Sequence, residues 1–149
     1  HLGRLTKYTT YDAEAVGVSL ALDQIYRARD PGPTTICIDN QAVLLSLTRR
    51  ESAIGQHIFD EIHAQVLKVF RKHQFARRGF RLELRWNTGH SGVEGNEAAD
   101  TEAKKASRGE TSEDGALPEF LRDGRQLPFS VGAIRQGLEK QCGILWGER

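Results

Sequence analysis

Residues 89–100 read Gly89-His90-Ser91-Gly92-Val93-Glu94-Gly95-Asn96-Glu97-Ala98-Ala99-Asp100. The glycine-rich half predicts a loop, and the strong helix formers after it predict a helix. Asn96 and Asp100 are four residues apart, so a helix places them one turn apart on one face. His90 can exchange protons near neutral pH. The simpler interpretation is a surface histidine beside a helix N-terminus whose acids favour the helix dipole.

Two carboxylates far upstream favour a functional site. Glu14 lies near the start of an apolar-rich helix predicted over residues 10–29. Asp39 ends a β-branched run, residues 34–39, which predicts a short buried strand behind a Pro-Gly-Pro breaker. An acid at the end of a buried strand is costly unless it is paired, hydrogen-bonded or bound to a metal. Ligand sites in α/β sheets gather at such strand ends.

Together these motifs resemble the ribonuclease H family, and most closely the ribonuclease H domains of fungal non-LTR (LINE-type) retrotransposon reverse transcriptase polyproteins. The family pattern has an acid on the first helix, an Asp and a polar pair after a strand, and a His loop leading to an Asn-Glu-x-x-Asp helix. The matching residues here are Glu14, Asp39-Asn40-Gln41, His90 and Asn96-Glu97-Ala98-Ala99-Asp100. The resemblance covers about residues 1–107.

The resemblance implies a metal-dependent endonuclease that hydrolyses the RNA strand of an RNA–DNA hybrid. Two Mg²⁺ ions, or Mn²⁺ as a substitute, would activate water and stabilise the leaving oxygen. The implied metal ligands and catalytic acids are Glu14, Asp39 and Asp100, and His90 would transfer protons or help the product leave. Asn40 and Gln41 would reach the minor groove of the hybrid, and Asn96 would support substrate binding.

The implied fold is α/β, a ribonuclease H-like mixed sheet flanked by helices. Residues 1–5 match the third strand of the family, so its first two strands, including a further catalytic Asp, precede this sequence. A sheet without them has an open edge. We therefore expect the missing strands to come from a second chain or an upstream polyprotein segment, or the sheet to be rearranged.

Composition places the chain among ordinary globular domains. It has 149 residues, a net charge of +1 and 28% charged residues, which neither demands nor excludes a nucleic-acid partner. Two cysteines, Cys37 in the predicted buried strand and Cys142 in a late helix, favour reduced thiols and hence an intracellular protein of the nucleus or cytoplasm, although a disulfide between them stays an alternative. Neither a signal peptide nor a membrane-spanning segment is predicted.

The remaining pattern predicts three regions. Residues 1–107 form the ribonuclease H-like domain, 108–128 a linker with a short turn at 119–122, and 129–149 an amphipathic helix capped by Ser130 that packs back on the domain or meets a partner. Within the first region we expect strands at 1–8, 34–39 and 80–86 and helices at 10–29, 41–48, 55–72 and up to 106.

Residues 68–78 contain five cations and no acid. They predict either contacts with a phosphate backbone or a solvated helix end whose cations suit the helix dipole.

A second class of function also fits the sequence. Without the first family Asp, the fold is also compatible with a catalytically inactive nucleic-acid-binding or assembly module. A different nuclease or an integrase-like transferase lacks support, because neither uses the histidine loop and its Asn-Glu-x-x-Asp helix.

Overall fold

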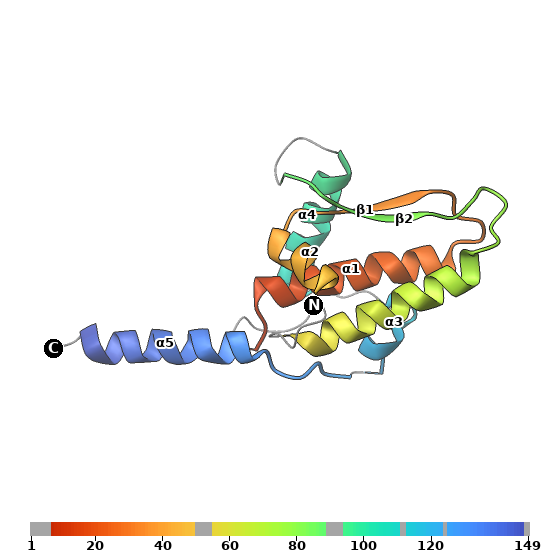
Figure 1. Cartoon of the computed structure of the whole chain (residues 1–149). Coiled ribbons are helices and arrows are strands. Elements are labelled where there is room, and N and C mark those ends of the chain that lie inside the picture. Colours follow the sequence, from red (N-terminus) through yellow and green to blue (C-terminus); the bar gives the residue numbers. More distant parts are fainter. Residues whose placement is uncertain (1–6, 50–54, 89–93, 111–112, 124, 148–149) are drawn as a thin grey trace.

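The structure, a computed structural model, describes residues 7–49, 55–88, 94–110, 113–123 and 125–147 (Figure 1). Its elements are, in order, α1 (Thr10–Arg27), β1 (Thr34–Ile38), α2 (Gln41–Thr48), α3 (Gln56–His73), β2 (Leu82–Trp86), α4 (Glu94–Ser107), the 3₁₀ turns η1 (Asp114–Ala116) and η2 (Glu119–Leu121), and α5 (Val131–Gly147). The predicted α/β class is confirmed, and each helix and strand expected over residues 10–106 is present within a few residues of its predicted bounds.

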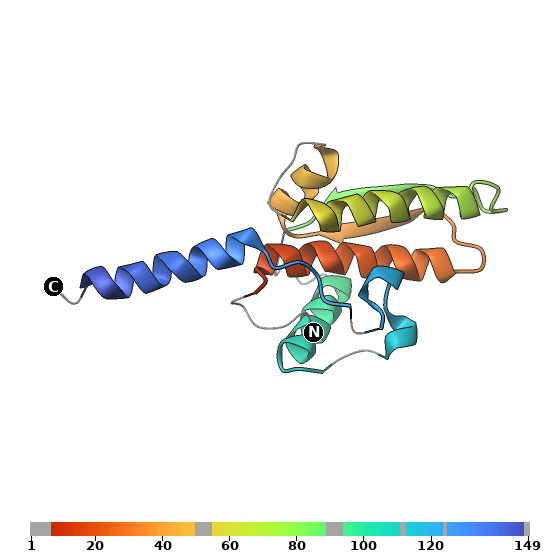
Figure 2. The same cartoon turned by 90° about the horizontal axis from the view of Figure 1, so that it is seen from below.

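The core lies between α1 and α3, which run side by side under the sheet (Figures 1 and 2). Residues at helical spacing on both helices are buried there: Val18 and Leu22 from α1, and Ile58, Phe59, Ile62 and Val69 from α3. A capping box begins α1, because the Thr9 hydroxyl accepts from the Asp12 N–H while the Asp12 carboxylate accepts from the Thr9 N–H. The core therefore follows from two amphipathic helices, as the sequence period predicts.

The sheet in the described residues consists of β1 and β2, which are parallel with Ile36 opposite Leu84. The expected mixed sheet is therefore not found in the described part of the chain. Ile36 and Ile38 are buried against the helices, whereas Thr35 and Cys37 are exposed on the other side. The expectation that Cys37 is buried is wrong, because α1 and α3 lie on one face of the sheet only (Figure 1), and Cys37 is a free thiol.

The predicted strand over residues 1–8 lies outside the described residues up to position 6, and residues 7–9 are not strand. Lys7 and Tyr8 instead contact the segment before α5. The Tyr8 hydroxyl donates to the Leu127 carbonyl at 2.8 Å, and the Ser130 N–H donates to the Lys7 carbonyl at 2.9 Å. The second bond satisfies the Lys7 carbonyl, a backbone group that a strand would have used in a sheet, and Tyr8 and Leu127 are both buried.

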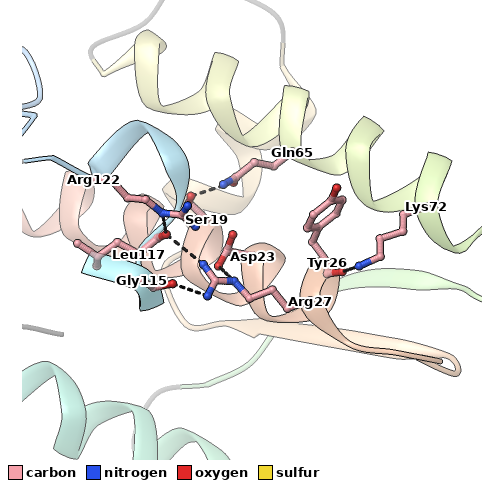
Figure 3. A network of polar contacts seen from close by, with 9 residues as sticks. All are labelled: Ser19, Asp23, Tyr26, Arg27, Gln65, Lys72, Gly115, Leu117 and Arg122. Carbon is pink, nitrogen blue, oxygen red and sulfur yellow. Dashed lines mark hydrogen bonds and ion pairs between the residues drawn. The ribbon is translucent and has the colours of Figure 1, made fainter. Parts of the chain in front are cut away.

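The predicted linker packs along α1 through one arginine (Figure 3). Arg27 pairs with Asp23 one turn earlier at 2.6 Å and donates to the carbonyl oxygens of Gly115 and Leu117. Arg122, just after η2, donates to the same Leu117 carbonyl at 2.7 Å. The turn expected at residues 119–122 is thus confirmed as η2, and these bonds hold the residues around it against α1.

Helix α5 extends away from the rest of the molecule (Figures 1 and 2). It begins as predicted at Ser130, whose hydroxyl accepts from the Ala133 N–H. Beyond buried Ala133, the apolar residues Ile134 and Leu138 are exposed, so over these residues α5 presents its apolar face instead of packing back. The side chains of Cys142 and Trp146 lie outside the described residues. Within the described chain, none of the helices combines the length and apolar character that crossing a membrane requires.

Candidate carboxylate site

Asp39 stands where β1 ends and α2 begins. Its backbone carbonyl accepts from the Trp86 indole N–H at 3.3 Å, and the Asn87 N–H donates to the Ile38 carbonyl at 2.9 Å, so the end of β2 fixes this corner. Next to it, the Asn40 side-chain oxygen caps α2 by accepting from the N–H groups of Ala42 and Val43. The end of β1 and the start of α2 together place Asp39 at the edge of the sheet, as the sequence predicted.

Glu14 is brought to the same corner by the first two turns of α1. Tyr11 lies three residues before Glu14 and so shares its helix face. The Tyr11 hydroxyl donates to the Ser46 hydroxyl of α2 at 2.7 Å, and the Tyr11 ring lies 5.6 Å from that of Phe59. These contacts hold the face of α1 that carries Glu14 against α2 and α3.

The two carboxyl groups interact directly. Burial, then the negative charge of Asp39, then a hydrogen bond shared with Asp39 raise the pKa of Glu14 to about 7. Two carboxylates at hydrogen-bond distance repel each other when both are ionised and no cation lies between them, so Glu14 keeps its proton up to about neutral pH. The arrangement can therefore exchange a proton near pH 7, or hold a cation in place of that proton.

The other predicted site residues are placed as follows. Asp100 lies on α4, where its carboxylate accepts from the Lys104 ammonium at 2.6 Å and its side chain is 32% exposed. This bond raises the pKa of Lys104. Gln41 is exposed at the first position of α2. His90 lies outside the described residues, and so does the side chain of Asn96, whose backbone belongs to α4.

The carboxylates that meet at this corner provide part of the ligand set that a hard divalent cation such as Mg²⁺ needs. Glu14 and Asp39 supply the oxygen ligands that Mg²⁺ prefers, and the raised pKa of Glu14 marks a place where positive charge is favourable. Within the described residues, no group of three His, Cys, Asp or Glu side chains is close enough to hold a metal ion. The structure thus brings together two of the three predicted ligands and leaves Asp100 paired with Lys104.

Trp86 belongs to this corner although the sequence did not single it out. Its register opposite Ile38 places it beside Asp39, and its ring is partly exposed. The only signal in the sequence was its place as the last residue of the predicted strand 80–86. An exposed aromatic ring beside two acids offers an apolar face to a sugar or base.

The raised pKa makes stability depend on pH in a defined direction. Between pH 4.5 and about 7 the folded chain keeps a proton on Glu14 that the unfolded chain has lost, so the free energy of unfolding falls as pH rises through this window. We expect Glu14→Gln to raise the free energy of unfolding by about 1–2 kcal/mol at pH 8 and to change it little at pH 5. One pKa unit corresponds to about 1.36 kcal/mol, and solvent screening of the partly exposed carboxyl reduces the total effect.

Urea denaturation at both pH values measures this difference. Glu61→Gln, on the exposed side of α3, is the matched control and should show no such pH dependence. An equal effect of Glu14→Gln at pH 5 and pH 8 would contradict the coupling with Asp39.

Comparison of this chain with models of known protein families, with curated proteins and with solved structures finds no match.

Proposed function

We propose that the chain is a metal-dependent nuclease of the ribonuclease H type, which hydrolyses the RNA strand of RNA–DNA hybrids, as in a retroelement polyprotein. The observation that carries the proposal is the meeting of Glu14 and Asp39, 25 residues apart in sequence, at the end of a parallel strand. Two acids that meet in this way repel each other when both are ionised, at a considerable electrostatic cost. A bound cation offsets this cost, and a role in proton transfer is the other reason for such a pair.

In this proposal Glu14 and Asp39 hold Mg²⁺, with Mn²⁺ as a substitute, and Asp100 joins them when α4 moves toward the corner. The bound metal ions would supply an activated water and stabilise the leaving oxygen of the phosphodiester. The chain's own residues do the rest: the two carboxylates stay ionised once a cation replaces their proton, and His90 moves a proton at the reacting oxygens.

Substrate contacts would come from the residues around the same corner. Asn40 and the exposed Gln41 follow Asp39 directly, and their amide groups would reach the minor groove, where RNA presents its 2′-hydroxyl groups. Asn96 would support them from the start of α4. The exposed Trp86 ring adds an apolar surface for a sugar.

The free edge of β1 supports a partner that completes the sheet. In the described residues β1 pairs with β2 alone, and its other edge offers unpaired N–H and C=O groups. We propose that a strand from a second chain or an upstream polyprotein segment pairs there and brings a further acid to the Glu14 and Asp39 corner.

Cleavage of a labelled RNA–DNA hybrid tests the proposal. With Mg²⁺ or Mn²⁺ we expect cuts in the RNA strand of the hybrid, no cuts in a DNA duplex of the same sequence, and no cuts in EDTA. The same assay is run with the chain alone and with an added upstream segment. Equal cutting of both duplexes, or cutting in EDTA, would contradict the proposal.

A catalytically inactive nucleic-acid-binding or assembly module on the same fold is the second candidate. The ion pair between Asp100 and Lys104 favours it, because the Asp100 carboxylate must give up its bond with the ammonium, 2.6 Å long, to bind a metal ion. Hybrid binding without cleavage under every condition above, with Asp100→Asn binding as well as the native chain, would select this function.

A further inference from the structure

The turn between α3 and β2 carries an aromatic ring that the described residues leave exposed. Phe75 is 89% exposed, the highest value among the large hydrophobic side chains of the described residues. A phenyl ring left in water forgoes the burial that aromatic side chains usually gain. We call residues 74–81 the Phe75 turn.

The Phe75 turn is anchored on both sides of the exposed ring. Before it, His73 is buried and its ring nitrogen lies 3.1 Å from the Ile25 carbonyl oxygen of α1. After it, the Phe80 ring packs 5.4 Å from those of His73 and Phe70. Consecutive backbone bonds, from the Ala76 N–H to the His73 carbonyl at 2.9 Å and from the Gly79 N–H to the Ala76 carbonyl at 3.0 Å, close the turn. Phe75 is therefore presented outward by an ordered backbone.

Several cations lie near Phe75 in the sequence, and two of them form no ion pair in the described part of the chain. Lys68 pairs with Glu119 at 3.5 Å, Arg78 reaches Asp30 at 4.0 Å, and Lys72 lies 4.4 Å above the Tyr26 ring. Arg71 and Arg77, four residues before and two after Phe75, are exposed and form no ion pair among the described residues. Together with the last turn of α3, the Phe75 turn thus combines an exposed ring with two guanidinium groups that form no ion pair in the described part of the chain.

We infer that the Phe75 turn binds single-stranded nucleic acid, with a base stacked on Phe75 and neighbouring phosphates on Arg71 and Arg77. A flat ring between cations is the pattern by which proteins bind unpaired strands, because every base has a face that can stack and every nucleotide carries a phosphate. A duplex keeps its base faces stacked on each other, so the ring would gain little from it. An acidic peptide would use the arginines but has no need of the ring.

This surface is separate from the carboxylate corner. The Thr34 N–H donates to the Arg81 carbonyl at 2.7 Å, so the Phe75 turn lies at the start of β1, whereas Asp39 follows its end. At about 3.3 Å per residue, the strand alone separates the two by roughly 15 Å. The inference therefore does not rest on the proposed nuclease activity.

Fluorescence anisotropy with a labelled 15-nucleotide oligo(dT) in EDTA and low salt tests it, since EDTA prevents metal-dependent cleavage. We expect Phe75→Ala to weaken binding about tenfold and Phe75→Trp to preserve it, because stacking on a base is sequence-tolerant and needs only an aromatic face. Phe129→Ala removes a half-exposed ring elsewhere and is the matched control, expected within twofold of the native chain.

The salt dependence tests the arginines. For a single strand, removing two phosphate contacts with Arg71→Gln and Arg77→Gln should reduce the slope of log K against log salt by about 1.4. The inference would be overturned if the native chain did not bind oligo(dT), or if Phe75→Ala bound it as tightly as the native chain. It would also be overturned if Phe75→Ala weakened binding of a blunt duplex of the same length by the same factor. Displacement of oligo(dT) by poly-glutamate at equal charge concentration would point to an acidic protein partner instead, and so would also overturn it.

Discussion

Replacing Asp39 by Asn should lower the rate of RNA–DNA hybrid cleavage by about a thousandfold or more. The substitution keeps the size of the side chain but removes one of the two anionic oxygen donors at the end of β1. Metal ions supply several kcal/mol of transition-state stabilisation, and about 4 kcal/mol corresponds to a factor of about a thousand in rate. Single-turnover cleavage in saturating Mg²⁺ measures the effect. Asp60→Asn, an exposed acid on α3, is the matched control.

Stability separates this loss from a folding defect. Because Asp39 raises the pKa of Glu14 by repulsion, Asp39→Asn should keep or increase the free energy of unfolding at pH 8 while activity falls. Cleavage by Asp39→Asn at the rate of the Asp60→Asn control would remove Asp39 from the mechanism. A fall in activity with an equal fall in folded fraction would assign Asp39 a structural role only.

The second large effect is expected in the core between α1 and α3. Leu22 on α1 is fully buried, with a relative exposure of 0%. Leu22→Ala should lower the free energy of unfolding by about 2–5 kcal/mol, because it loses buried apolar area and leaves a cavity between the helices. Leu67→Ala on α3, where the side chain is 57% exposed, makes the same chemical change and should cost less than about 0.5 kcal/mol.

Urea denaturation of both variants, with the slope compared as well as the midpoint, tests this pair. Equal destabilisation by Leu22→Ala and Leu67→Ala would mean that α1 and α3 do not form the core described above. A Leu22→Ala variant too unstable to fold supports the prediction, provided that Leu67→Ala folds normally.

Local patterns in the sequence were sufficient for most of the helices and strands. The run 34–39 and the alternation 80–86 predicted β1 and β2, and Asp30-Pro31-Gly32-Pro33 predicted the end of α1, because each rests on contacts within a few residues. Local signals placed Glu14 near the start of a helix and Asp39 at the end of a strand. That the two acids share one site was implied only by the resemblance of their motifs to the ribonuclease H family.

Features that depend on distant partners could not be predicted in the same way. The exposure of Cys37 depends on helices covering one face of the sheet, which no alternation within 34–39 encodes. Arg27 holds the segment around Leu117 through backbone carbonyls, and these acceptors are the same for any residue type. Likewise, the amphipathic pattern of α5 predicts an apolar face but not what lies against it.

The meeting of Glu14 and Asp39 is the claim on which the rest depends, and a carboxyl-carbon NMR titration of Glu14 tests it most directly. In the native chain without metal we predict a Glu14 pKa of about 7, a lower value in Asp39→Asn, and a lower value in the native chain with Mg²⁺. A Glu14 pKa near the ordinary 4.5 that neither Asp39→Asn nor Mg²⁺ alters would contradict the account.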